Sequence, residues 1–223
     1  VDPEYIQEIF AERFSIAELE RCDSTDPKHR ALHAWGLAWR QTKQTIDVEP
    51  DLFNRPANME PHPDFPESPW WEAIGVTLAR YARPDPDHPT WHAERMESWV
   101  KDAEPHHQER ARRAFWWIWI ASQRAIPETE IPTASLNAYG FALGRRNGSG
   151  TSRFRPINDV LLELLSSRMD LSVPIHNGWR EGLGHALGEN WGPACITHTR
   201  DQGDPVLLKG CKAGIELRWL RQK

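Results

Sequence analysis

The feature of this sequence that most constrains its fold is a segment with no polar side. Residues 114–121 read AFWWIWIA, inside the longer stretch HHQERARRAFWWIWIASQRA. A helix that is apolar all the way round has to be covered on every face by other elements. The rest of the chain supplies mostly helical patterns. We therefore expect a mainly α fold, a multi-helix bundle, in which 105–125 is a central and largely buried helix.

Most of the remaining sequence carries apolar residues at helical spacing. Ile6, Ile9, Phe10 and Phe14 predict an amphipathic helix over 3–21. Capping residue types and periodicity predict further helices over 26–46, from Ser68 and Pro69 onward, over 90–103, over 135–144 as a short helix or turn, from about 158, and over 177–189. Near the end, the runs ACITHTR, DPVLLKG and GIELRWLR have the pattern of short strands, so the predicted fold includes a small C-terminal β-hairpin over 194–218.

The order of these segments predicts two regions. Six prolines fall between residues 47 and 69 and remove backbone donors that a continuous helix or a central strand needs. We expect an acidic helical N-terminal region over 1–65, ending in this Pro-rich connector. The second region, over 66–223, is a Trp-rich helical body with the hairpin. The 12 tryptophans fit helix packing, because large rings fill the space between helices.

Cysteine usage and hydropathy bear on the compartment. Cys22, Cys195 and Cys211 form no CxxC pair and show no Cys/His spacing typical of zinc sites. Their odd number argues against a disulfide framework and favours a reducing compartment. No stretch approaches the roughly 20 apolar residues that span a bilayer, and the acidic start is unlike a secretory or mitochondrial leader. We expect a cytoplasmic protein that engages no membrane.

Charge is distributed unevenly along the chain. The formal net charge is -5, yet residues 1–104 hold 21 acidic and 11 basic side chains, and residues 105–156 hold 3 acidic and 8 basic ones. All eight bases of the middle segment are arginine, and the remainder of the chain is balanced. An acidic protein can bind a polyanion through one local basic surface. Nucleic acid is therefore the predicted partner.

The first group of candidate binding residues flanks the sequence NGSGTS. It comprises Arg145, Arg146, Arg153 and Arg155. Small residues let a backbone approach phosphates closely, and guanidinium groups hold phosphates with paired hydrogen bonds. The segment lacks the Lys-Ser/Thr ending of a nucleotide-hydrolysing phosphate loop. It therefore predicts phosphate binding without phosphate cleavage.

A second group lies on the predicted central helix. At 100° per residue, Arg110, Arg113, Trp117 and Arg124 fall within about 60° of one another. They predict a cationic stripe, with Trp117 as a candidate for stacking on a base. Core packing explains most other tryptophans.

The sequence contains no complete catalytic motif, and we expect a protein that is not an enzyme and needs no metal or other cofactor. Alternatives stay open. The spacings His29/His33 and His88/His92 match the HxxxH pattern of helical metal ligands, which would suit a metal-dependent hydrolase, but the Glu of HExxH is missing. Arg180 to His185 matches the loose Rx4H spacing of some ribonucleases. A phage or complex assembly scaffold would use the arginines against acidic protein surfaces instead.

The succession of motifs after residue 106 resembles a known family. An alanine/aromatic helix is followed by Ser135-Leu136, then LGRRNGSGTSRF, a leucine-rich helix, PIHNGWREGLGHALGENW and IELRWLR. This order is similar to that of the small helical subunit of type I-E CRISPR surveillance (Cascade) complexes. The resemblance covers the C-terminal half of the chain.

The resemblance implies an all-helical, non-catalytic subunit, present in more than one copy per complex. Its partners would be other protein subunits, the guide RNA with its target, and the displaced strand. It places Arg145, Arg146 and Arg153 on nucleic acid and makes Phe154 and Trp219 structural. The expected function is thus antiviral: a subunit of a prokaryotic nucleoprotein complex that binds nucleic-acid backbone through arginines without sequence readout.

Overall fold

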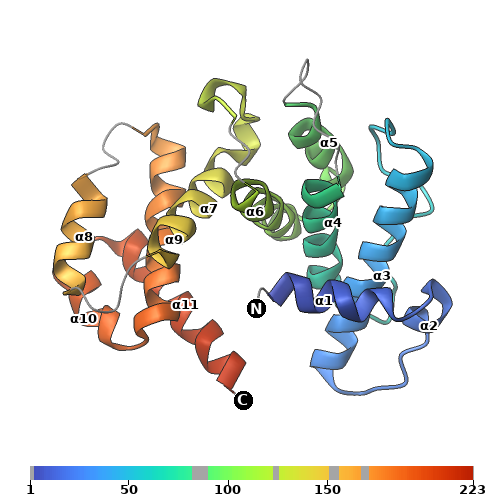
Figure 1. Cartoon of the computed structure of the whole chain (residues 1–223), viewed down its shortest axis with the longest axis horizontal. Coiled ribbons are helices and arrows are strands. Elements are labelled where there is room, and N and C mark those ends of the chain that lie inside the picture. Colours follow the sequence, from blue (N-terminus) through green and yellow to red (C-terminus); the bar gives the residue numbers. More distant parts are fainter. Residues whose placement is uncertain (1–2, 82–89, 123–125, 151–155, 167–170, 223) are drawn as a thin grey trace. The chain divides into compact units, whose positions relative to one another are not determined.

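A computed structural model describes residues 3–81, 90–122, 126–150, 156–166 and 171–222 of the chain. All regular elements in these ranges are helical (Figure 1). The chain divides into two compact units, Val1–Pro132 and Thr133–Lys223. The predicted division lay at residue 65 instead. The helices on either side of the Pro-rich connector pack against each other, which keeps both in the first unit.

Unit 1 contains six α-helices and one 3-10 turn in its described residues. They are α1 (Pro3–Glu12), α2 (Ile16–Glu20), α3 (Pro27–Val48), α4 (Glu67–Tyr81), α5 (Trp91–Val100), α6 (Pro105–Ala121) and η1 (Glu128–Glu130). Helix α4 packs against α3 on one side and α6 on the other, while α1 and α2 cover α3 and α5 covers α6.

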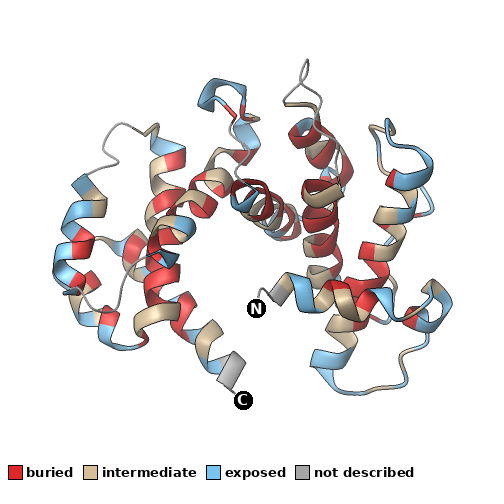
Figure 2. Ribbon diagram, in the orientation of Figure 1, coloured by how far each residue is buried: buried red, intermediate tan, exposed pale blue. Residues whose placement is uncertain are grey.

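The predicted central helix is confirmed as α6, which buries Phe115, Trp116, Ile118, Trp119 and Ile120. Figure 2 shows buried residues concentrated along α4 and α6. The indoles of Trp35, Trp39, Trp70, Trp99 and Trp116 are among the largest fully buried side chains of the chain. Core packing is therefore the main role of the tryptophans in this unit.

The start of the chain departs from the predicted single helix over 3–21. Helix α1 ends at Glu12 and α2 begins at Ile16. Between them Ser15 forms a capping box: Ser15 Oγ accepts from the Glu18 backbone N–H, and the Glu18 carboxylate accepts from the Ser15 backbone N–H at 2.7 Å. Satisfying free backbone donors in this way starts a new helix. The prediction for 26–46 is confirmed by α3, with Asp26 as its N-cap.

Unit 2 contains η2 (Thr133–Ser135), α7 (Leu136–Ser149), α8 (Ile157–Ser166), α9 (Val173–Trp191), α10 (Ala194–Asp201) and α11 (Pro205–Gln222). Helix α9 lies between α7 and α11 and packs against both (Figure 1). A buried apolar cluster around Trp179, Leu183 and Leu187 of α9 includes Ile157 and Leu161 of α8 and Leu207 and Ile215 of α11.

Glycines bring these three helices unusually close. A Cβ on Gly144 of α7 would overlap the carbonyl oxygen of Trp179 on α9, and a Cβ on Gly182 of α9 would overlap that of Phe141 on α7. The same holds between α9 and α11 at Gly184, Gly188, Gly210 and Gly214. At four-residue spacing, such glycines fall on one helix face and let two backbones touch.

The predicted C-terminal hairpin is wrong, because the described part of that region is helical in α10 and α11. Helix α11 starts at Pro205, where the Asp204 carboxylate accepts hydrogen bonds from the backbone N–H groups of Val206 and Leu207. The glycines that looked like strand breakers are contact residues against α9. Their effect depends on a partner helix, which a local pattern does not reveal.

The expectation of no disulfide is also wrong. Cys195 of α10 and Cys211 of α11 form one, and both are completely buried in the unit 2 core. Cys22 is the remaining cysteine and is a free thiol. Among the described residues, no helix combines the length and the apolar character that crossing a bilayer requires.

Candidate functional site

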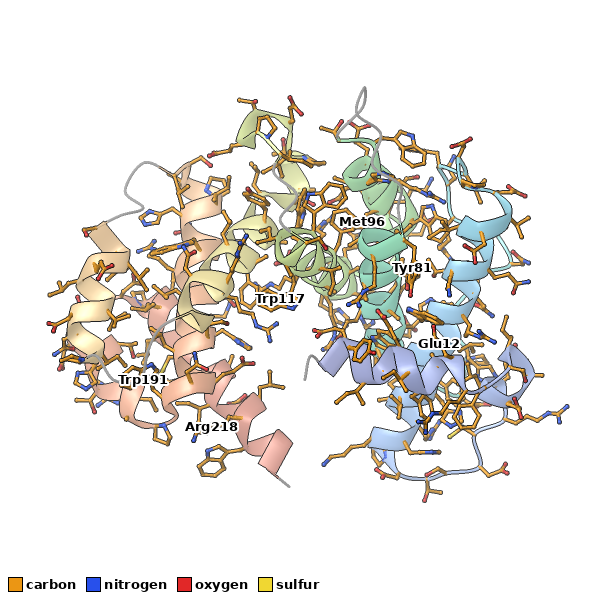
Figure 3. All side chains as sticks on the ribbon, viewed as in Figure 1. Glu12, Tyr81, Met96, Trp117, Trp191 and Arg218 are labelled. Atoms are coloured by element: carbon orange, nitrogen blue, oxygen red, sulfur yellow. A yellow bond between two sulfur atoms is a disulfide. The ribbon has the colours of Figure 1, made fainter. Side chains whose placement is uncertain are left out.

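The predicted arginine stripe lies on α6 in unit 1, and its described arginines are ion-paired. Arg110 Nη2 lies 2.7 Å from Glu72 Oε2 of α4, and Arg113 Nε lies 2.7 Å from Glu109 Oε1 one turn earlier on α6. Trp117 is half-buried on the same helix (Figure 3). Arg124 lies outside the described residues. A phosphate would have to displace two carboxylates to reach this surface.

The arginine/glycine segment is not a loop where it is described. Arg145 to Ser149 form the last part of α7. Arg145 Nη2 lies 3.4 Å from Glu189 Oε1 of α9, and only 15% of the Arg145 side chain is exposed. Arg146 is exposed. Arg153 and Arg155 lie outside the described residues, so Arg146 is the described member of this group that solvent reaches best.

The two units differ in net charge. Residues 1–132 hold 24 acidic and 15 basic side chains, a formal net charge of -9. Residues 133–223 hold 8 acidic and 12 basic side chains, a formal net charge of +4. Exposed cationic side chains of unit 2 include Arg146, Arg200, Lys209 and Lys212. Unit 2 therefore carries a net positive charge, whereas unit 1 carries a net negative one.

Arg180 and His185, the residues of the Rx4H spacing, both lie on α9 but have separate partners. Arg180 Nη1 donates to Asp204 Oδ2 at 2.9 Å and Arg180 Nη2 donates to Asn177 Oδ1 at 2.7 Å. His185 Nδ1 lies 3.6 Å from Glu189 Oε1. The contact with Asp204 joins α9 to the residue before α11, and the other two contacts lie within α9. Arg180 and His185 therefore have structural roles.

The first histidine pair lies at the start of α3 and has a third member that the sequence analysis missed. Cys22 Sγ lies 3.5 Å from His29 Nδ1. One ligand atom from each of Cys22, His29 and His33 lies within 4.8 Å of the other two. The structure therefore brings a histidine next to Cys22, although the sequence shows no Cys/His spacing typical of zinc sites. Of the second pair, His92 is buried in α5 and His88 lies outside the described residues.

A sequence signal for Cys22 exists, although it is weak. The spacing is Cx6HxxxH, and the capping residues Ser24 and Asp26 fall between the cysteine and the first histidine. A turn at this place can bring a residue before the helix back over its first turn. The sequence pattern alone does not show that this turn closes, so it does not reveal Cys22 as a neighbour of the histidines.

Comparisons of the chain with protein families, with curated proteins and with solved structures gave no match. The resemblance to the Cascade small subunit therefore rests on the sequence motifs alone. Any functional assignment has to come from the residues and their arrangement.

Proposed function

We propose that this protein is a non-catalytic helical subunit of a nucleoprotein complex, and that unit 2 binds nucleic-acid backbone without reading sequence. The observation that carries the proposal is the division of charge, -9 on unit 1 and +4 on unit 2. A polyanion is attracted to the cationic unit and repelled by the acidic one. Unit 1 then serves protein contacts, which an acidic surface tolerates.

Within unit 2, Arg146 is the first candidate for a phosphate contact because it is exposed on α7. Lys209 and Lys212 of α11 are exposed as well, with 71% of the Lys209 side chain accessible although it pairs with Glu181 at 3.2 Å. Arg145 is mostly covered and paired with Glu189, so it has a smaller part in the proposal. Arg153 and Arg155 lie outside the described residues, and the sequence alone predicts that they also contact phosphate.

The α6 arginines have a secondary role in this proposal. Arg110 and Arg113 contribute to phosphate binding only after they leave Glu72 and Glu109. The Arg110–Glu72 pair is partly exposed, and an exposed ion pair is worth about 0–1 kcal/mol, so exchanging this carboxylate for a phosphate costs little. The acidic surroundings of unit 1 nevertheless oppose the approach of a polyanion.

The test is binding of labelled single- and double-stranded RNA and DNA to the full chain across a salt series. Arg146→Glu is expected to weaken binding and to lower the slope of log affinity against log salt by about 0.7–0.9 per lost phosphate contact. Lys101→Glu, the same kind of change at an exposed site in unit 1, is the matched control and is expected to leave the slope unchanged.

If no complex with RNA or DNA forms at low salt, with or without partner subunits, the proposal is wrong. Equal losses of nucleic-acid affinity in the two charge-reversal variants would also contradict it. Binding would then depend on the net charge of the whole chain and not on the surface of unit 2. If Arg146→Glu abolishes capture of partner subunits and leaves nucleic-acid retention unchanged, the arginines serve an assembly scaffold instead.

A further inference from the structure

The strongest unassigned feature of the molecule is the cluster of Cys22, His29 and His33 in unit 1. It joins one soft sulfur ligand and two imidazoles, with one ligand atom of each within 4.8 Å of the others. Cys22 lies in the segment between α2 and α3, and the two histidines lie one turn apart on α3. Both histidines therefore face the same side of the helix.

Local hydrogen bonds hold the cysteine over the helix. The Asp26 backbone N–H donates to Ser24 Oγ at 3.2 Å, and the Lys28 backbone N–H donates to Asp26 Oδ1 at 2.9 Å. These bonds close the turn that enters α3. At the other end of the segment, the Arg21 backbone N–H donates to the Glu18 carbonyl at 3.2 Å. The position of Cys22 is thus set by contacts outside the cluster.

His33 is buried and its orientation is fixed. Its Nδ1 lies 3.0 Å from the carbonyl oxygen of Leu19 on α2, which can only accept, so Nδ1 is the donor of this hydrogen bond and Nε2 is the nitrogen available to a metal. Metal-bound histidines commonly donate their other ring N–H to a carbonyl in this way. The rings of Phe10, Phe14 and Phe65 lie 5.5, 6.2 and 6.3 Å from the His33 ring and form an apolar wall.

The chemistry of the set favours zinc. Thiolate and imidazole ligands suit Zn²⁺, which takes a tetrahedral arrangement with Zn–S of about 2.3 Å and Zn–N of about 2.0–2.1 Å. Those bond lengths put sulfur and nitrogen about 3.6 Å apart, and Cys22 Sγ lies 3.5 Å from His29 Nδ1. Cys22 is half-buried and His29 is exposed, so the cluster is open to solvent on one side.

We propose that Cys22, His29 and His33 bind one Zn²⁺ ion, with a fourth coordination position open to water or a small ligand. Three protein ligands with an open fourth position are the arrangement of zinc sites that engage an exogenous molecule. The site lies in unit 1 and uses none of the residues of the proposed nucleic-acid surface. The zinc proposal and the proposed function can therefore be tested independently of each other.

The experiment uses the full chain, purified without a histidine tag and freed of metal with a chelator. Titration with Zn²⁺ is expected to give one equivalent bound and to raise the Tm, because a metal that binds the folded state stabilises it. Titration with Co²⁺ is expected to give a thiolate-to-metal charge-transfer band and the d–d bands of a tetrahedral ion. Added thiocyanate is expected to shift the d–d bands by occupying the open position.

Cys22→Ser is the decisive variant because it removes the sulfur at a half-buried position and leaves the histidines in place. Its affinity for Zn²⁺ is expected to fall on the order of 100-fold or more, because losing even a residue that only hydrogen-bonds to a metal ligand costs about 10–100-fold. The charge-transfer band is expected to disappear. His29→Gln is expected to weaken binding similarly. His106→Gln, at an exposed site on α6, is the matched control and keeps full binding.

Circular dichroism of each variant separates loss of metal from loss of fold. Wild-type protein that binds far less than one equivalent of Zn²⁺, or that binds Zn²⁺ as tightly after Cys22→Ser as before, overturns the proposal. In that case the Cys22–His29 contact is an ordinary thiol–imidazole hydrogen bond. A cobalt spectrum that thiocyanate does not change overturns the open fourth position.

Discussion

The two units of this protein bring helices together by opposite means. In unit 1, large indoles fill the space between helices: five of the six tryptophans exposed by less than 2% belong to it. In unit 2, small residues remove that space: among the described residues, eight glycines there would place a Cβ against a neighbouring helix backbone, against only Gly75 in unit 1.

The difference shows that one chain can use two sources of helix-packing energy. A buried indole removes about 150–250 Å² of surface from water, worth roughly 4–6 kcal/mol at about 25 cal/mol per Å². Glycines bury little area of their own but permit close contact between backbones, where many weak dispersion contacts add up. The stability of unit 1 should therefore be most sensitive to the loss of side-chain volume, and that of unit 2 to added side-chain volume.

The largest effect is expected from Trp116→Ala in α6, where the removed side chain is fully buried. The cavity left behind is expected to lower the free energy of unfolding by about 3–5 kcal/mol, as measured by chemical denaturation. The control is Trp219→Ala, at a tryptophan that is 59% exposed, and the expected change is within about 0.5 kcal/mol. An equally large loss there would mean that Trp219 is structural, as the family resemblance implies.

The opposite change tests unit 2. Gly144→Ala adds one methyl group where the Trp179 carbonyl oxygen already occupies the space. Because backbone has to move, the expected loss exceeds about 3 kcal/mol, above the usual cost of overpacking. Gly150→Ala is the matched control, since its nearest atoms are 3.8 and 3.9 Å away and its φ is -78°. A neutral Gly144→Ala variant would refute backbone contact between α7 and α9.

A third prediction concerns the disulfide, which only unit 2 has. Cys195 and Cys211 are 16 residues apart, and a loop of that size is worth about 3 kcal/mol through its effect on the unfolded chain. Reduction of the disulfide is expected to lower the Tm of unit 2 and to leave the Tm of unit 1 unchanged. Thiol titration in denaturant without reductant should find one reactive thiol, Cys22; three would show that the disulfide does not form.

The smallest effect is a pH dependence in unit 1. Burial, followed by the neighbouring His106, lowers the pKa of His107 below its ordinary value of 6.5. The unfolded chain then binds a proton more readily than the folded protein, so stability falls as pH drops through 6.5 and levels off below the folded pKa. His107→Gln should reduce this slope in unfolding measured between pH 5 and pH 7.5. An unchanged slope would mean that a group other than His107 causes the pH dependence of stability.

How much of the fold the sequence predicted depends on how local the signal was. Helix α3 was predicted nearly to its ends because Asp26 caps it and its apolar residues repeat at 3.6-residue spacing. The C-terminal hairpin was wrong because Gly210 and Gly214 act through α9, which is a tertiary contact. A glycine that breaks an isolated helix stabilises one that has a close partner.

The same rule applies to the candidate sites. The position of Arg110 and Arg113 on α6 was predicted, and Glu109 could be paired with Arg113 from sequence because the two are four residues apart. Glu72 and Glu189, which neutralise Arg110 and Arg145, come from other helices and were not foreseen. Cys22 was missed for the same reason, since its contact with His29 depends on how the turn before α3 closes.

The most direct test of the account is to purify the native assembly that contains this chain and to measure whether nucleic acid accompanies it. We expect ultraviolet absorption and nuclease digestion to reveal bound nucleic acid, and crosslinking to join it to unit 2. A native assembly that is free of nucleic acid, or one in which crosslinks fall only on unit 1, would contradict the proposed function.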